Sequence, residues 1–413
     1  MFCENDKKII GELARQYREI ANLEVNQERK QRLSDVNDLK TGLRPSVWLD
    51  ELPWHEMDID GKLKLHCQDE FARGMEWFFR TTLFRWEYFQ ADMVVENFYP
   101  ISKSYSSNGN GMEIHEQIKE TDAKNNIVSH AYEDSLSTEE DLKKLHPTVI
   151  TPHPERDEAN MAKARELLGE ILPVRLMGTP VYYAPWDEIS MLRGVEPVLY
   201  DMADRPEFLH EIMRRYTENQ KNIMLQMEQY NLLENDPLSI HCTPAYNTSL
   251  PPVEADGKVR LKNVWFRGTA QMFSTVSPAM HEEFELDYMR PLMEMCGLVY
   301  YGCCEPLDNK ISILKSIPNL RKIGVSPWAN IEKSGGQIGS SYVYARKPNP
   351  AQVAVNVDAE AVEKEIEDTI KVCLRYGCPY EFVLKDISTV SYKPGNIIEW
   401  NRIVQKTIDK YYK

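Results

Sequence analysis

Short apolar stretches alternate with amphipathic, helix-like stretches along most of this chain. The apolar stretches are short and rich in aromatic and branched side chains, which is typical of buried strands. They predict eight strands: Ser46–Asp50, Met93–Tyr99, Val174–Met177, Leu238–Cys242, Val264–Arg267, Leu298–Gly302, Lys322–Val325 and Tyr380–Leu384.

Helical periodicity lies between most of these strands. It predicts helices at about 67–83, 157–171, 206–231, 278–296, 307–317 and 358–377, and a last helix near 394–411. Eight strand–helix units favour an α/β fold of the (β/α)8 barrel type, and a doubly wound sheet is the alternative.

The chain has no shift in composition and no repeat that indicates a domain boundary. We therefore predict one barrel over residues 41–413, preceded by a helical extension over residues 1–40. Residues 101–137 interrupt the alternation and are rich in Ser, Asn and Gly, so we predict an insertion over the barrel mouth. Residues 247–260 and 330–350 have the composition of loops.

The composition and charge of the chain argue against some kinds of binding partner and indicate a cellular compartment. The formal net charge of −15 argues against nucleic acid, which requires a basic surface. No run of about 18 apolar residues predicts a membrane span, and no targeting segment is recognisable, so we expect a cytoplasmic protein. Eight cysteines in 413 residues, without framework spacing, indicate free thiols in a reducing compartment.

Two thiols and a carboxylate follow one of the predicted buried strands. Cys303, Cys304 and Glu305 lie at its carboxyl end, the edge where α/β proteins place their chemistry. A thiolate with a nearby imidazole or carboxylate can hold zinc and leave one position open. Adjacent thiols on a strand point to opposite faces, so both reach one site only if the chain turns there.

Three further polar residues end other predicted strands. His241 ends Leu238–Cys242 and is a candidate ligand or acid–base group, because imidazole titrates near neutral pH. Lys385 and Asp386 follow the last predicted strand, where they suit either a substrate contact or a structural ion pair. We take His241, Glu305, Lys385 and Asp386 as the candidate catalytic residues.

Aromatic residues beside carboxylates lie near the ends of other strands. Such pairs can stack on a planar substrate and orient it, although they are equally common in rims and cores. The candidate substrate contacts are Glu51, Trp54, His55, Trp186, Gln271, Tyr301 and Trp328. The chain lacks a dinucleotide fingerprint, a Walker loop, a nucleophile elbow and a cobalamin-binding signature, so any corrinoid would arrive on another protein.

Several stretches spread over nearly the whole chain resemble the uroporphyrinogen decarboxylase superfamily, in particular its methyltransferase-like branch. They are Leu49-Asp-Glu-Leu-Pro-Trp-His-Glu-Met-Asp58, Tyr183-Ala-Pro-Trp-Asp-Glu188, Tyr301-Gly-Cys-Cys-Glu-Pro-Leu307, Ile317–Trp328, Arg346-Lys-Pro-Asn-Pro350 and Lys385-Asp-Ile-Ser-Thr389. The resemblance implies a (β/α)8 barrel.

The resemblance implies two possible activities. Decarboxylation of tetrapyrrole acetates uses an Arg-rich N-terminal motif, whereas the corresponding stretch here has only Arg44 and turns acidic. Methyl transfer to a corrinoid protein uses zinc held by a His-x-Cys at one strand end and a later Cys. Cys303 or Cys304 matches the first Cys, the His position falls on Tyr301 or Gly302, and Ser388–Val390 offers no later thiol.

The resulting hypothesis is a methyltransferase component that moves a methyl group from a small methoxylated or methylated compound to a separate corrinoid protein. Zinc at Cys303 or Cys304 is a possible cofactor. We expect a monomer or homodimer. The alternatives are a decarboxylase or lyase acting on a small acid, and a non-catalytic barrel that binds a tetrapyrrole or corrinoid.

Overall fold

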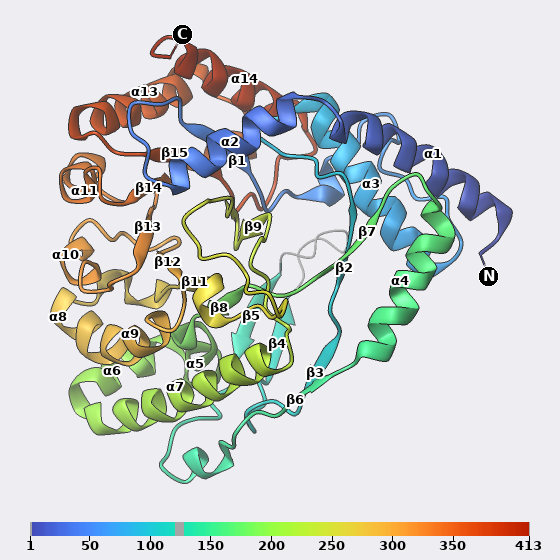
Figure 1. Ribbon diagram of the computed structural model, residues 1–413. Helices are drawn as coiled ribbons and strands as arrows, with labels where there is room; N and C mark the ends of the chain where they lie inside the picture. The colour runs from blue at the N-terminus through green and yellow to red at the C-terminus, as the bar shows by residue number, and fades with distance from the viewer. Residues whose placement is uncertain (1, 120–127, 413) are drawn as a thin grey trace.

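A curved sheet of seven parallel strands forms the centre of the computed structural model, which describes residues 2–119 and 128–412 (Figure 1). The sheet order is β1-β15-β14-β13-β12-β11-β8. The strands are β1 (Ser46–Leu49), β8 (Val181–Tyr183), β11 (Trp265–Gly268), β12 (Leu298–Tyr301), β13 (Leu320–Val325), β14 (Val343–Arg346) and β15 (Tyr380–Leu384).

Neighbouring strands follow the chain order, as in a barrel, without the reversal of a doubly wound sheet. The first strand, β1, pairs in parallel with the last, β15, so that Leu49 lies opposite Leu384. At the other edge, β8 pairs with β11. No ladder joins β8 to β1 within the described ranges, so the predicted α/β class holds but the closed eight-stranded barrel is not found there.

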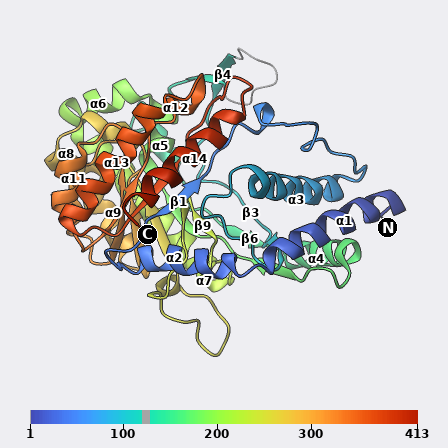
Figure 2. The same ribbon diagram turned by 90° about the horizontal axis from the view of Figure 1, so that it is seen from above.

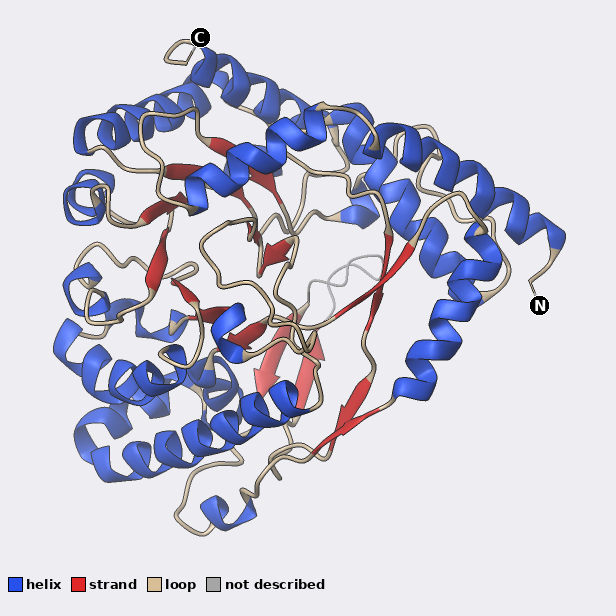
Figure 3. Ribbon diagram, in the orientation of Figure 1, coloured by secondary structure: helices blue, strands red, loops and turns tan. Residues whose placement is uncertain are grey.

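Helices cover the outer side of the arc, as Figure 3 shows. They are α5 (Pro185–Arg193), α6 (Val195–Asp204), α7 (Pro206–Gln229), α8 (Pro278–His281), α9 (Asp287–Met293), α10 (Ile311–Leu314), α11 (Ile331–Ile338), α12 (Ala351–Ala354), α13 (Ala359–Tyr376) and α14 (Gly395–Asp409). Short helical turns lie at η1 (Trp54–Glu56), η2 (Asp141–Lys144), η3 (Leu261–Asn263), η4 (Gln271–Thr275) and η5 (Glu282–Leu286).

A second group of helices stands beside the sheet and has its own apolar core. It contains α1 (Glu4–Ala21), α3 (Glu70–Tyr88) and α4 (Pro154–Leu168), together with the parallel pair β2 (Tyr99–Ser102) and β7 (Val174–Met177). Ile10, Phe79 and Leu168 are fully buried in this core. The predicted N-terminal extension therefore packs with later parts of the chain, and α2 (Val25–Asn37) contacts β1.

Three small antiparallel pairs complete the described strands. They are β3 (Tyr105–Ser107) with β6 (Ile150–Pro152), β4 (Glu116–Lys119) with β5 (Ser129–Tyr132), and β9 (Ser239–Ile240) with β10 (Thr243–Pro244). Figure 2 shows β4 on the same side of the molecule as α12, which follows the carboxyl end of β14. Residues 120–127 of the predicted insertion lie outside the described residues.

Several sequence predictions need correction. Residues 330–350 are not a loop, because they contain α11 and β14, and β8 was not predicted. Met93–Tyr99 contributes only Tyr99 to a strand. The predicted helix at 278–296 is divided into α8, η5 and α9, and that at 307–317 forms only α10. None of the described helices is both long enough and apolar enough to cross a membrane.

Candidate functional site

The two adjacent thiols follow β12 at a turn. Gly302 has a φ of +98°, a conformation that L side chains rarely adopt, and its backbone lies against Gly324 of β13. The turn places both thiols on one side, with the Sγ atoms of Cys303 and Cys304 3.6 Å apart. Cys303 is buried and Cys304 is partly exposed. The turn at Gly302 therefore allows both adjacent thiols to reach the same site.

Glu305 holds this turn in place. Its Oε2 accepts a hydrogen bond of 2.9 Å from the Cys303 backbone N–H, and its Oε1 accepts one of 2.8 Å from the Thr269 hydroxyl. The side chain is buried, and both carboxylate oxygens are used. The predicted catalytic Glu305 thus fixes the backbone that carries Cys303.

His241 and Cys242 form the tip of the β9–β10 hairpin. Both have positive φ, +40° and +25°, an uncommon conformation for residues other than glycine. Only Ser239–Ile240 of the predicted strand Leu238–Cys242 is extended, because the chain reverses directly after it. Leu238–Cys242 is therefore half of a tight hairpin and contributes no strand to the sheet.

Buried contacts hold the hairpin inside the curve of the sheet. Lys322 of β13 donates a 3.0 Å hydrogen bond through Nζ to the Pro244 carbonyl, and the Trp265 indole donates one of 3.0 Å to Ala245. From the opposite side, Asn37 of α2 donates to the carbonyls of Pro244 and Tyr246. These contacts direct the hairpin tip towards the thiols.

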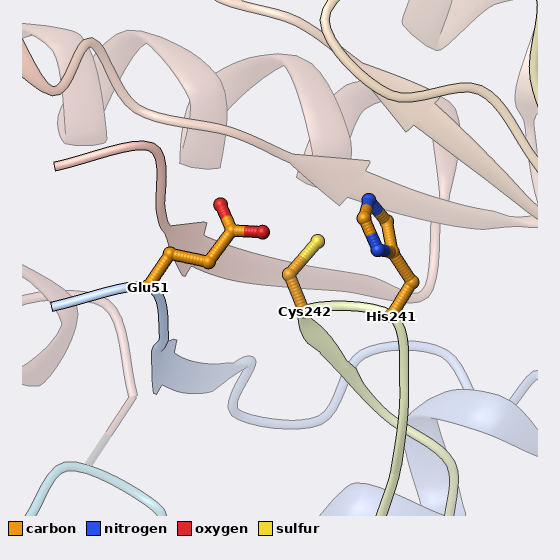
Figure 4. Close-up of side chains that lie close together, drawn as sticks. All are labelled: Glu51, His241 and Cys242. Atoms are coloured by element: carbon orange, nitrogen blue, oxygen red, sulfur yellow. The ribbon is translucent and has the colours of Figure 1, made fainter. Parts of the chain in front are cut away.

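One imidazole, three thiols and a carboxylate converge at this point. The His241 Nε2 lies 3.6 Å from the Cys303 Sγ, and Cys242, beside His241 at the hairpin tip, acts on the pKa of Cys303. Donor atoms of Glu51, His241 and Cys242 all lie within 4.8 Å of one another, and Figure 4 shows the three side chains together. Sulfur, imidazole nitrogen and carboxylate oxygen are the ligands that zinc takes in proteins.

Lys385 and Asp386 extend this cluster from the end of β15. The Lys385 Nζ lies 3.4 Å from the Cys303 Sγ, 3.3 Å from a Glu51 oxygen and 2.7 Å from Asp386. Cys304 donates a 3.1 Å hydrogen bond to Asp386. Of the two alternatives that the sequence left open, the structure shows the ion pair, and the substrate contact stays a prediction.

The charges of the cluster shift its pKa values. Hydrogen bonds from Cys242 and Cys304 lower the pKa of the Cys303 thiol well below its usual value, although burial opposes this. The same contact raises the pKa of Cys304. Burial opposes the charge on Lys385, but the facing thiols Cys242 and Cys303 raise its pKa overall. The cluster therefore favours a thiolate at Cys303.

The remaining predicted contacts are dispersed. Trp186 is fully buried against Phe273, with ring centroids 4.8 Å apart, and the Tyr301 hydroxyl bonds His281 at 2.7 Å on the helical side of the sheet. Both predicted contacts are therefore core residues. Gln271 donates to Asp187, and Trp328 is 71% exposed beyond the end of β13.

Trp54 and His55 lie beside α3. With Trp77, they line a cavity of about 590 Å³. Trp54 makes an edge contact with Trp77 at 5.8 Å, and His55 makes one with Tyr392 at 6.4 Å. Of the residues predicted near the first strand, only Glu51 reaches the thiols.

Sequence reasoning missed three members of the site. They are Cys242, Tyr182, whose ring stacks on His241 with centroids 5.2 Å apart, and Arg267, a buried guanidinium on β11. One signal for Arg267 was present in the sequence, since a charged residue directly follows the apolar run Val264-Trp-Phe266 within a predicted strand. The position of Cys242 depends on the β9–β10 hairpin, which the sequence pattern did not predict.

Taken together, the molecule is an α/β protein in which buried thiols meet a partly exposed imidazole and an exposed carboxylate where β12 and β15 end. No family model matches the sequence, and no curated protein matches it. Among solved structures it is similar to a methyltransferase from Methanosarcina mazei, with a TM-score of 0.49 and 11% sequence identity over 93% of this chain and 99% of that chain.

Proposed function

We propose that this protein is the methyl-transferring component of a corrinoid-dependent system and that its strand-end cluster holds a zinc ion. The observation that carries the proposal is the approach of donor atoms of Glu51, His241 and Cys242 to within 4.8 Å of one another, with the Cys303 Sγ 3.6 Å from the His241 Nε2. Glu51 adds a carboxylate within reach of the same point. One imidazole and two thiols are the kinds of ligand that the superfamily resemblance led us to expect.

The distance between the His241 and Cys303 donor atoms and the charge of a thiolate both fit a zinc site. In a tetrahedral centre with bonds of 2.0 to 2.3 Å, a nitrogen and a sulfur ligand lie about 3.5 Å apart. The His241 Nε2 and the Cys303 Sγ are 3.6 Å apart. The lowered pKa of Cys303 favours the thiolate, which is the form that binds metal.

The proposed ligands differ from the positions that the sequence motif suggested. The motif aligned the histidine with Tyr301 or Gly302 and the later cysteine with Ser388–Val390. Tyr301 faces the helical layer, so it offers nothing to the thiols. The β9–β10 hairpin supplies an imidazole and a thiol instead. The proposal supposes a barrel of the (β/α)8 type in which this hairpin occupies the interior.

Zinc in this setting supplies a Lewis acid that stabilises negative charge on a substrate oxygen or sulfur. Around it, Lys385 holds Glu51 and Asp386 in place through ion pairs of 3.3 and 2.7 Å. The Tyr182 ring is 45% exposed and covers His241, so it offers a surface for stacking. In the overall reaction the donor loses its methyl group, cob(I)alamin supplies the electron pair of the new cobalt–carbon bond, and the leaving oxygen takes a proton.

The proposal is tested by mixing the zinc-supplemented protein with cob(I)alamin and a panel of aryl methyl ethers and methylamines. We expect methylcob(III)alamin absorbance to develop with at least one donor. The Cys303→Ala variant should lose this activity, whereas Cys296→Ala, which removes another buried thiol, should retain it. No product with any donor, or full activity of Cys303→Ala, would contradict the proposal.

A further inference from the structure

A buried arginine beside the thiol cluster has most of its hydrogen-bond donors unused. Arg267 of β11 has no exposed surface. Its Nη1 donates to the Gly268 carbonyl, whereas Nε and Nη2 have no hydrogen-bond partner in the part of the chain that the structure describes. Burying a guanidinium without partners is unfavourable, because its N–H groups lose their water.

The surroundings of Arg267 compensate its charge only in part. The guanidinium carbon lies 4.5 Å from the Tyr300 ring centroid and 5.8 Å from that of Tyr182. Cation–π contacts of this kind stabilise a desolvated guanidinium, but they supply no acceptors for the Nε and Nη2 hydrogens. Among residues 2–119 and 128–412, no carboxylate lies within ion-pair distance of Arg267. Lys322 provides a contrast, since it is equally buried and has Glu381 at 2.8 Å.

A second cation near Tyr300 is similarly unpaired. Lys347, which follows β14, donates a 2.5 Å hydrogen bond to the Tyr300 hydroxyl and lies 5.2 Å from the ring centroid. Lys347 is buried, and no described carboxylate forms an ion pair with it. Two buried cations therefore lie beside the Tyr300 ring beneath the thiol cluster, and the acidic groups that act on Arg267 include Cys303 and Glu305. A buried cation with unsatisfied donors attracts an anion.

The unused atoms of Arg267 form one particular edge of the guanidinium. The Nε–H and the outer Nη2–H point in parallel, and this edge matches the two oxygens of a carboxylate. Arg267 also influences the site directly, since its charge helps to lower the pKa of Cys303. The half-exposed Tyr182 ring contacts both Arg267 and His241.

We propose that Arg267 binds a carboxylate of the substrate through its Nε–Nη2 edge, so that the methyl donor is a small carboxylic acid. This inference rests on the function proposed above, because it assigns the substrate class of the same site. The carboxylate would supply the negative charge and the two acceptors that Arg267 lacks. Lys347 would add to the attraction for the anion, and displacement of the Tyr182 ring would open the path.

The proposal is tested by isothermal titration with matched acids and amides, namely acetate and acetamide, benzoate and benzamide, and 4-methoxybenzoate and 4-methoxybenzamide. We expect at least one acid to bind about tenfold more tightly than its amide, because only the acid completes the guanidinium edge. Arg267→Met should abolish this preference. Arg214→Met, which changes an exposed arginine of α7, should leave it intact. Equal affinities for every acid and amide, no binding of any acid, or a preference that survives Arg267→Met would overturn the proposal.

Thermal unfolding of the ligand-free proteins separates a binding role from a structural one. Arg267 leaves its Nε and Nη2 donors unsatisfied in the ligand-free fold, so Arg267→Met should melt at the same temperature as the wild type or higher. A large fall in melting temperature would show that the guanidinium supports the fold and would overturn the assignment. Neither measurement uses corrinoid or methyl transfer. Loss of methyl transfer with intact acid binding would count against the proposed function and leave the role of Arg267 standing.

Discussion

The Sγ of Cys303 lies 3.6 Å from the Nε2 of His241, although 62 positions separate the two residues in the sequence. Cys303 reaches this point from a parallel strand, and His241 reaches it from a hairpin inside the curve of the sheet. The contact depends on two local conformations, the turn at Gly302 and the hairpin tip at His241–Cys242. Changes at either place should therefore disturb the contact between Cys303 and His241.

The turn at Gly302 gives the first prediction. Gly302→Ala adds a side chain at a φ of +98° and brings its Cβ against Leu307, so we expect a loss of about 2–4 kcal/mol in the free energy of unfolding. Urea denaturation measures it. Gly74→Ala in α3 is the matched control, since its Cβ meets open space on a helix and should stabilise by about 0.5–1 kcal/mol. Equal effects of the two substitutions would show that the turn is not constrained.

The buried ion pair between β13 and β15 gives a second prediction. Lys322 and Glu381 lie 2.8 Å apart with almost no exposed surface. Lys322→Met leaves the Glu381 carboxylate buried without its partner, and we expect a cost of about 3–5 kcal/mol. The double variant Lys322→Met/Glu381→Leu should be more stable than either single variant. Strictly additive losses in denaturant titrations would contradict the pairing.

The dependence of stability on pH gives a third prediction. Burial lowers the pKa of Lys310 to about 8, whereas an unfolded lysine titrates near 10.4. Between these values the unfolded chain binds more protons than the folded one, so stability rises with pH over this range. The gain is at most about 3 kcal/mol.

Lys310→Met removes the group responsible and is the matched comparison. We expect the difference in melting temperature between the wild type and Lys310→Met to change in favour of the wild type as the pH rises from about 8 towards 10. The Lys310 ammonium donates to the Phe273 carbonyl, so the variant also loses one hydrogen bond. A difference that is constant across the range would mean that Lys310 has an ordinary pKa.

The sequence predicted the strands that are continuous and apolar. β12 and β15 lie close to their predicted positions because Leu298–Tyr301 and Tyr380–Leu384 are fully buried runs. β14 and α11 were missed because they lie in a stretch rich in Gly, Ser and Pro. Gly335 has a tertiary explanation there, since a Cβ at this position would meet Val372 of α13 at 2.5 Å. Close packing of α11 against α13 requires glycine at this position, and the local sequence does not reveal that packing.

Only part of the candidate site could be predicted, because only some of its residues follow strands that the sequence pattern identifies. Cys303, Cys304, Lys385 and Asp386 follow recognisable strands, so their shared edge could be inferred from the order of elements. His241 was placed at a strand end, but its route to Cys303 is a hairpin whose contacts come from α2, β11 and β13. Trp186 and Tyr301 have the sequence pattern of rim residues, yet they face the helical layer. The direction in which a strand-end side chain points depends on packing that the sequence pattern does not contain.

The zinc content of the purified, tag-free protein tests the central claim most directly. Elemental analysis after growth with added zinc and exhaustive dialysis should give about one zinc ion per chain. His241→Ala and Cys303→Ala should each lower this value about tenfold or more, while Cys296→Ala, a buried thiol outside the cluster, should leave it unchanged. A wild-type protein without zinc, or a zinc content that does not respond to His241→Ala and Cys303→Ala, would contradict the claim.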